Sequence, residues 1–284
     1  MWFVDLLIKE LKFPESPVWS QRDQCLYLVE WTGDRVLCYH KSKLELVFST
    51  KPGGGPSGLG QDLQGNFWVC LYSSQELVHY SANGEIIHSI SSYRGKEFRG
   101  PCDLVMDKQG GVYFTDSGNF EGDWVSGKPV GAVYYLDPNG LIHEIDRGLC
   151  FPNGIALSPE EKKLYVNEHR KNQTLIYELD EFGLPRTKSV FAIYDNDCLL
   201  DEKDSFELGP DGLSVDQEGN LWVAHYGGGK IVKINPKGEL IQELRLPQGR
   251  KPTSTAFQTV SRELFVTEAE YGSLFRYYEA HFNA

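Results

Sequence analysis

Residues 209–223 read GPDGLSVDQEGNLWV, and this stretch decides the fold because similar motifs recur along the chain. It predicts a tight Gly-Pro turn, a short apolar strand, a polar turn and a second apolar strand. Related text is GPSGL at 55–59, GPCDL at 100–104 and FPNGI at 151–155, with weaker copies PESPV at 14–18 and PTST at 252–255. Each copy is followed by a second apolar strand.

The spacing of these copies predicts the architecture. Their prolines are separated by 42, 45, 51, 58 and 42 residues. A repeat of roughly 40–50 residues that holds several short strands is typical of a propeller blade. The sequence therefore predicts an all-β, six-bladed β-propeller with little helix.

The two ends of the chain predict how the ring closes. Residues 2–9 have the pattern of a strand that precedes the first repeat, and residues 273–278 have that of the third strand of the last repeat. If the N-terminal strand becomes the outermost strand of the sixth blade, the two chain ends lie side by side and an unpaired edge is removed. We therefore expect a single propeller domain over residues 1–284, closed by the N-terminal strand joining the last blade.

Composition limits the partners. The formal net charge of -12 argues against nucleic acid, because a phosphate backbone needs a basic surface. No apolar run approaches the ~20 residues that span a bilayer, and the apolar start lacks the basic leader of a signal peptide. The six cysteines form no CxxC pair, so we expect reduced thiols, with a Cys25–Cys38 bridge as the less favoured alternative. These features favour a cytoplasmic protein that is a monomer or a small homo-oligomer.

The residue after each repeat proline is a candidate to point at the central channel. All six are polar or a thiol: Glu15, Ser57, Cys102, Asn153, Asp211 and Thr253. Carboxylates that converge there without partners would be costly, and a hard divalent cation with oxygen ligands removes that cost. The lack of Cys/His spacing argues against structural zinc. The alternative is that each is only a turn residue.

The end of each second strand should reach the same face, because the first two strands of a blade are antiparallel. Asp116, His225 and Glu268 stand at such ends and are candidate substrate contacts, or else satisfied polar residues of loops. Two inserts, at 118–128 and 195–205, are rich in Gly, Asp, Asn and Ser. Such inserts either cover a pocket or are tolerated surface loops.

The chain resembles the SMP-30/gluconolactonase family, the regucalcin-like six-bladed propellers, over nearly its whole length. The resemblance rests on PESPVW at 14–19, FPNGIALS at 151–158 and GPDG at 209–212. It implies one divalent ion, usually calcium and in some members zinc or manganese, with ligands that map onto Glu15, Asn153 and Asp211. It also assigns Asp211 the role of base or nucleophile.

The third blade departs from the family pattern. Members often carry an Asn-Asp pair where this chain has Cys102-Asp103. Either Asp103 takes the place of that Asn, or the Cys102 thiol lines the pocket and fewer side chains hold the metal. The substrate-binding Arg that some sugar-lactone members place just before that pair is matched only by Arg99, one step earlier. Both differences weaken the case for a particular sugar lactone.

The expected activity is opening of a lactone, a sugar lactone or similar cyclic ester, to a hydroxy acid by metal-activated water. Asp211 or Asp103 would take a proton from the attacking water. Three alternatives stay open. They are a phosphotriesterase using the same site, a strictosidine-synthase-like condensing enzyme with Glu268 as its base, and a non-catalytic binding propeller.

Overall fold

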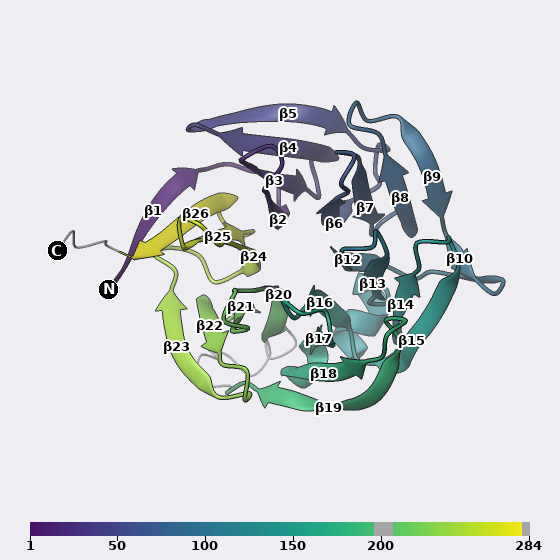
Figure 1. The fold of residues 1–284 in the computed structure, drawn as a ribbon. Helices are drawn as coiled ribbons and strands as arrows, with labels where there is room; N and C mark the ends of the chain where they lie inside the picture. The colour runs from purple at the N-terminus through teal and green to yellow at the C-terminus, as the bar shows by residue number, and fades with distance from the viewer. Residues whose placement is uncertain (196–206, 280–284) are drawn as a thin grey trace.

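Six four-stranded antiparallel sheets surround a central channel in the computed structural model (Figure 1). The structure describes residues 1–195 and 207–279. Blades 1 to 3 comprise β2 (Pro14–Ser20), β3 (Cys25–Glu30), β4 (Arg35–His40) and β5 (Lys43–Ser49); β6 (Pro56–Gln61), β7 (Phe67–Leu71), β8 (Glu76–Tyr80) and β9 (Ile86–Ile90); and β12 (Pro101–Met106), β13 (Val112–Asp116), β14 (Gly131–Leu136) and β15 (Ile142–Leu149). Blades 4 to 6 comprise β16 (Pro152–Leu157), β17 (Lys163–Glu168), β18 (Gln173–Leu179) and β19 (Pro185–Ile193); β20 (Gly209–Val215), β21 (Leu221–Tyr226), β22 (Lys230–Ile234) and β23 (Leu240–Arg245); and β24 (Pro252–Gln258), β25 (Glu263–Glu268), β26 (Ser273–Glu279) and β1 (Trp2–Ile8). The predicted propeller is confirmed.

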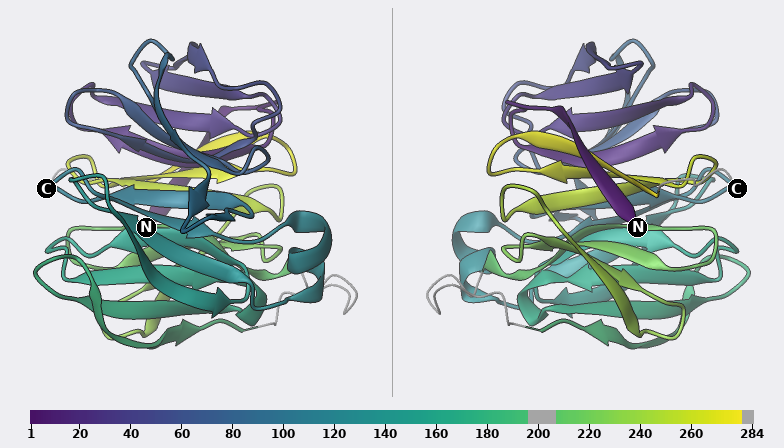
Figure 2. Two further views of the ribbon diagram at one scale, coloured as in Figure 1. Left: turned by 90° about the vertical axis from the view of Figure 1, so that its right-hand side faces the viewer. Right: turned by 90° about the vertical axis from the view of Figure 1, so that its left-hand side faces the viewer.

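Three short elements lie outside the blades. The hairpin of β10 (Ser92–Tyr93) and β11 (Lys96–Glu97) connects blades 2 and 3. The π-helix η1 (Phe120–Trp124) lies in the insert between β13 and β14, and the 3₁₀-helix η2 (His169–Lys171) follows β17. Figure 2 shows η1 projecting from one face of the disc. The insert predicted at 195–205, and Cys198 within it, lie almost wholly outside the described residues.

The N-terminal strand closes the ring as predicted. β1 pairs antiparallel with β26, from Trp2 opposite Glu279 to Ile8 opposite Leu274, and the two strands lie side by side in Figures 1 and 2. The indole of Trp2 also packs edge-on against Trp222 of blade 5, with ring centroids 5.2 Å apart. The sixth blade is therefore built from both ends of the chain.

One apolar cluster fills each space between neighbouring blades. Between blades 5 and 6, for example, Trp222 packs with Leu264 and Phe275, all fully buried. The other five interfaces are filled in the same way by residues from the facing sheets. Because each blade buries its two faces only against its neighbours, the ring is the unit that holds the fold together.

The innermost strands β2, β6, β12, β16, β20 and β24 contact one another around the channel. In β16 and β20 the glycine of the repeat motif allows this close approach. A Cβ at Gly154 would collide with the backbone carbonyl of Asp211, and one at Gly212 would collide with Ser254. The Pro-Asn-Gly and Pro-Asp-Gly texts are thus explained by the contact between adjacent inner strands.

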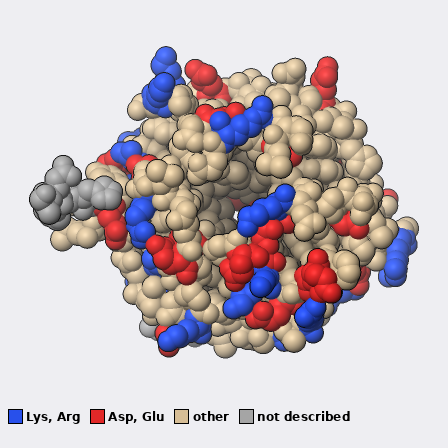
Figure 3. Space-filling view, viewed as in Figure 1, with Lys and Arg blue, Asp and Glu red and all other residues tan. Residues whose placement is uncertain are grey.

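The face opposite η1 is hollowed at its centre, where the channel opens between the ends of the inner strands (Figure 3). Apolar residues dominate the wall of this opening, among them Trp19, Leu104, Leu157 and Phe257. Among the described residues, Asp103 is the one ionisable residue on this wall. Charged side chains of both signs are distributed around the rim in Figure 3. In the described part of the chain, no helix is long and apolar enough to cross a membrane.

Candidate active site

A small cavity lies on the channel axis at the face that carries η1. Five of the six predicted channel residues line it, and four of these are Glu15, Cys102, Asn153 and Asp211. Each follows a repeat proline, and the strand pairing shifts register just after it, for instance between Pro210 and Leu213 of β20. Such a bulge turns a side chain out of the sheet, here towards the axis. Ser57 also lines the cavity.

Hydrogen bonds between blades fix these positions. Ser57 donates from Oγ to the carbonyl oxygen of Pro101 (3.3 Å), and Asn167 Nδ2 donates to that of Asp211 (2.5 Å). The sixth channel residue, Thr253, donates to the carbonyl oxygen of Pro14 (2.7 Å) and lies outside the cavity wall. The peptide groups that carry the site are therefore held rigidly by the neighbouring blades.

The cavity concentrates negative charge. Burial, then the charges of Asp211 and Asp103, raises the pKa of Glu15 well above its ordinary value. Burial and the charge of Asp103 likewise raise the pKa of Asp211. No basic side chain of the described residues forms an ion pair with Glu15 or Asp211. Two carboxylates thus face one small space, and no cation among the described residues neutralises them.

Cys102 and Asp103 differ in their surroundings. The Cys102 thiol lines the cavity and lies 3.2 Å from Asn153 Oδ1, to which it donates, and burial raises its pKa. Asp103 occupies the position of the motif glycine and extends deeper into the channel. Its carboxylate accepts from the Ser16 hydroxyl (3.2 Å) and from the backbone N–H groups of Leu104 (2.8 Å) and Ile155 (3.1 Å). Burial nevertheless raises its pKa to about 7.

Aromatic rings cover the cavity. Those that line it are Phe13, Trp31, Tyr72, Phe120, Trp124, Phe151 and Tyr226. Phe120 and Trp124 belong to η1, so the insert at 118–128 covers the cavity, one of the two outcomes expected for it. The rings close the space tightly: about 20 Å³ remains for the centres of water molecules, enough for one or two of them.

Comparison with known proteins identifies the family to which the chain belongs. A profile described as the SMP-30/Gluconolactonase/LRE-like region matches residues 13–270, which is most of the chain. The chain belongs to this family. It is 27% identical over 289 aligned positions to a gluconolactonase of Zymomonas mobilis, covering 93% of this chain and 78% of the relative. It is 34% identical over 199 positions to lactonase drp35 of Staphylococcus epidermidis, covering 68% of this chain and 57% of the relative.

Solved structures agree on the fold of the family. A gluconolactonase from Xanthomonas campestris superposes with a TM-score of 0.80 at 22% identity, covering 96% of this chain and 88% of that one. A luciferin-regenerating enzyme superposes with a TM-score of 0.82 at 21% identity, covering 99% of this chain and 96% of that one. A calcium-binding regucalcin from Agrobacterium tumefaciens gives 0.75 at 18%, covering 95% and 92%. At these identities the likeness establishes the propeller fold alone.

The divalent ion implied by the family fits the residues of the cavity. Glu15, Asn153 and Asp211 present two carboxylates and one amide oxygen, which are ligands that Ca²⁺ accepts. The two unpaired carboxylates are the observation that supports the fit, since a cation would neutralise them. No group of three or more His, Cys, Asp or Glu side chains within the described residues could hold a metal. The set would therefore depend on the amide oxygen of Asn153.

Asp116 and Glu268 lie one strand further out, and neither lines the cavity. Each stands opposite the repeat proline of its blade and accepts a backbone hydrogen bond from the loop that leads into that blade, and Glu268 accepts further ones from the turn that follows it. Asp116 Oδ1 accepts from the N–H of Gly100 (2.7 Å), and Glu268 accepts from the N–H groups of Glu270 and Tyr271. These bonds give both carboxylates a clear structural role.

Arg99 lies beside the covering insert. Its Nη2 is 2.6 Å from the carboxylate of Asp123 in η1, and that carboxylate also accepts from the N–H of Asn119 (3.0 Å). Arg99 therefore attaches the insert to the start of blade 3. It does not line the cavity as the structure stands.

His225 takes the corresponding place in blade 5 and is fully buried. Its Nε2 lies 2.9 Å from Asn172 Oδ1, and its ring packs near Tyr194. Burial, together with the charge of Lys230, lowers the pKa of His225 to about 3. The side chain is away from the cavity and is held neutral.

Replacing His225 with Gln is expected to reduce the acid sensitivity of the fold. The folded pKa of about 3 lies below the ordinary value near 6.5, so the stability from neutral His225 is complete above about pH 6.5. That stability is lost as the pH falls towards 3, by roughly 2 kcal/mol at pH 5. The difference in Tm between pH 7 and pH 5 should therefore be smaller in His225→Gln than in the unmodified protein. The exposed His88→Gln should leave that difference unchanged, and an equal effect of both variants would contradict the assignment.

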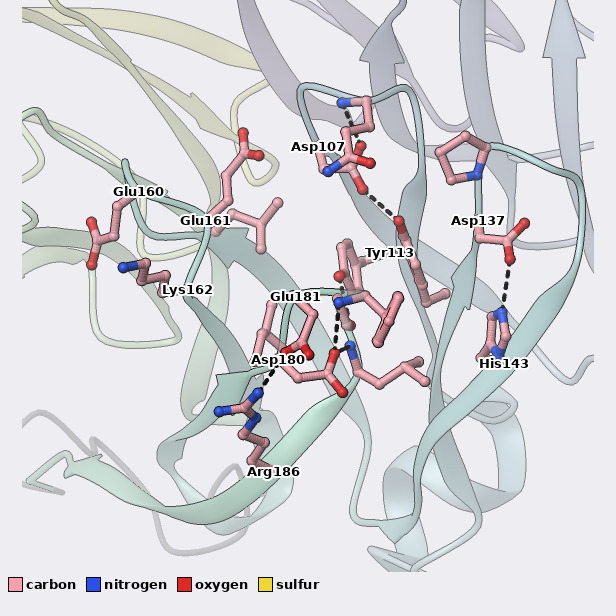
Figure 4. Close-up of a pocket in the computed structure, with 18 of the residues that line it drawn as sticks. Asp107, Tyr113, Asp137, His143, Glu160, Glu161, Lys162, Asp180, Glu181 and Arg186 are labelled. Carbon is pink, nitrogen blue, oxygen red and sulfur yellow. Dashed lines mark hydrogen bonds and ion pairs between the residues drawn. The ribbon is translucent and has the colours of Figure 1, made fainter.

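A larger depression lies between blades 3 and 4, away from the channel (Figure 4). It has a volume of about 900 Å³ and an acidic wall. Carboxylates of this wall are engaged by neighbouring groups of the protein. Asp107 accepts from the Tyr135 hydroxyl (2.7 Å), and Asp137 lies 2.9 Å from His143. Asp180 accepts from the backbone of its own turn. These are turn-stabilising contacts, so the cavity on the axis is the stronger candidate.

Proposed function

We propose that this chain is a divalent-metal-dependent hydrolase that opens a lactone to a hydroxy acid. The observation that carries the proposal is the convergence of Glu15 and Asp211, without basic partners, beside Asn153 on the channel axis. The chain belongs to a family whose named members include gluconolactonases and lactonases, and the relatives quoted above carry those names.

Glu15, Asn153 and Asp211 would hold the ion, with calcium as the expected cation and zinc or manganese as alternatives. When bound, such an ion supplies Lewis-acid polarisation of a carbonyl oxygen and favours ionised carboxylates around it. Ser57 and the Cys102 thiol complete the wall beside these ligands. Cys102 stands where many family members have Asn and donates its hydrogen bond to Asn153 Oδ1, thereby orienting that amide.

Asp211 is the proposed base. It takes a proton from water while the water oxygen attacks the lactone carbonyl. The C–O bond of the ring then breaks, and the proton passes to the departing alkoxide to give the hydroxy acid. Asp103 suits this role less, because three hydrogen bonds fix its carboxylate deeper in the channel.

The deciding experiment measures metal content and lactone hydrolysis together on purified protein. Both are followed before chelation, after chelation, and with Ca²⁺, Mn²⁺ or Zn²⁺ restored. We expect hydrolysis to disappear on chelation and to return with one ion. Bound metal without lactone turnover would support a different ester, such as a phosphotriester, on the same site. Protein that binds none of the three ions would overturn the proposal in favour of a binding propeller.

A further inference from the structure

The walls of the cavity above Glu15 and Asp211 consist almost entirely of aromatic rings. Apart from the proposed metal ligands, the residues that line it are the seven aromatic side chains, Ser57 and Cys102. A polyhydroxylated sugar ring needs hydrogen-bond partners for each hydroxyl group it buries. A flat apolar group needs only ring faces.

The polar atoms of Trp31, Tyr72 and Ser57 on these walls already have partners in the protein. The Tyr72 hydroxyl donates to the carbonyl oxygen of Gly118 (2.5 Å), and Trp31 Nε1 donates to Ser73 Oγ (3.2 Å). Ser57 Oγ donates to the carbonyl oxygen of Pro101. Because these polar atoms are already bonded, Trp31 and Tyr72 present the flat faces of their rings to a ligand.

Phe120 packs against both of these rings, which also contact each other with centroids 5.3 Å apart. Its ring centroid lies 5.1 Å from that of Trp31 in blade 1, 5.3 Å from Tyr72 in blade 2 and 5.7 Å from Phe151 in blade 4. It is also stacked on Trp124, 4.7 Å away. One ring carried by the covering insert thus fills an aromatic enclosure formed by several blades.

The insert is attached in a way that permits displacement. Phe120 is only half-buried, and η1 is a single short turn capped by the side chain of Asn119. The Arg99–Asp123 ion pair connects it to blade 3, with Arg99 47% exposed, so this link is weak in water. The space left beneath Phe120 holds only one or two water molecules. A substrate that reaches Asp211 must therefore move this ring.

We propose that the site takes a lactone or ester with an aromatic or similarly flat apolar group, and that this group takes the place of Phe120 against Trp31 and Tyr72. The inference rests on the proposed function for the identity of the reacting group. It assigns Trp31, Tyr72 and Phe120 as specificity-determining residues. It places polyhydroxylated sugar lactones among the poor substrates, because their hydroxyl groups would meet ring faces.

The test uses two lactams as probes, because lactams imitate the lactone ring and resist hydrolysis. One is the benzo-fused six-membered lactam dihydroquinolinone, and the other is the polyhydroxylated gluconolactam. Binding to the full, metal-loaded chain is measured by calorimetry and by tryptophan fluorescence. We expect the aromatic lactam to bind at least about tenfold more tightly, the scale of one or two ring-to-ring contacts.

Variants assign the preference to the named rings. Trp31→Leu should weaken binding of the aromatic lactam by about tenfold, whereas Trp31→Phe, which keeps a ring, should retain most of it. Phe182→Leu, at a ring that is 72% exposed and distant from the cavity, is the control. Phe120→Ala should bind the aromatic lactam no more weakly than the unmodified protein, since no ring then has to be displaced.

The outcomes separate this inference from the proposed function. Tighter binding of gluconolactam, binding of neither lactam, or an unchanged affinity in Trp31→Leu would each overturn the aromatic assignment. If Trp31→Leu does not fold, a marked loss of affinity in Phe120→Ala would overturn it instead. Aromatic preference in a protein that hydrolyses no lactone would keep the assignment and refute the proposed hydrolysis.

Discussion

Asp211→Asn is expected to reduce kcat/KM for lactone hydrolysis by about 10³ or more while leaving the propeller folded. The substitution keeps the shape of the side chain and one oxygen, but it removes the proposed base, a loss that typically costs 10²–10⁴-fold, and one carboxylate of the proposed metal set. The measurement is steady-state hydrolysis with saturating cation, together with circular dichroism. Retention of full activity would remove Asp211 from the chemistry.

The same variant makes a second, opposite prediction for stability. In chelated protein Asp211→Asn should raise the Tm, because ionised Asp211 is buried near Glu15 and Asp103 without a cation. Burial, then the charge of Asp103, raises its pKa, so this cost is absent in acid, grows as the pH rises above the ordinary carboxyl pKa and is complete once the pH exceeds the raised pKa. The gain should therefore be larger at pH 8 than at pH 5.

Asp216→Asn, in the same blade, is the matched control. Asp216 is buried, but its carboxylate accepts from the backbone N–H of Asn220 (2.8 Å) and from Trp222 Nε1 (3.1 Å). Losing these bonds should lower the Tm and leave kcat/KM unchanged. A drop in stability paired with intact activity in Asp216→Asn, and the reverse in Asp211→Asn, would separate the site from the scaffold.

The sequence predicted the ring and the position of the channel residues because both follow from one repeated local text. A proline with a polar residue after it specifies a strand start with a register shift, and the same text in successive blades brings those starts to one axis. Glu15, Asn153 and Asp211 could be expected together for that reason. The family resemblance, not the spacing, supplied their proposed roles as ligands.

The roles of Asp116 and Glu268 could not be predicted in the same way. A carboxylate at the end of a second strand can face a pocket or accept backbone hydrogen bonds, and the surrounding amino-acid sequence does not distinguish the two arrangements. The structure shows the second arrangement, in which Glu30 also takes part by accepting from the N–H of Lys12 (2.9 Å). An acidic residue that recurs at this place in several blades was the available signal.

The aromatic cover was the feature least accessible from sequence. Phe120 and Trp124 lie in an insert with no strand periodicity, and the rings they contact come from other blades at large separations along the chain. Trp31, Tyr72 and Tyr226 stand at the ends of second strands, where the sequence favours packing over contact with a substrate. Only the tertiary arrangement shows that they pack on one another over the proposed metal ligands.

Deleting residues 2–9 is expected to cost more stability than any single substitution discussed above. β1 supplies the outermost strand of blade 6, so its loss leaves β26 with an unpaired edge and uncovers the indole of Trp222. It also removes the ion pair of Asp5 with Arg276. We expect the Tm to fall by at least about 10 °C, which corresponds to roughly 3–5 kcal/mol in a chain of this size, and aggregation on heating to increase.

Two proline substitutions distinguish the effect of opening the ring from the effect of disrupting any outermost strand. Val4→Pro interrupts β1 opposite Tyr277, and Ser89→Pro interrupts β9, the outermost strand of blade 2, opposite Val78. Both remove a backbone donor from an edge strand. β9 belongs to a blade whose four strands are consecutive in the chain, whereas β1 joins a blade whose other three strands come from the far end of the sequence. Val4→Pro should therefore lower the Tm more than Ser89→Pro and increase proteolysis near both chain ends. Equal losses would mean that β1 acts as an ordinary outer strand and that the ring stays closed without it.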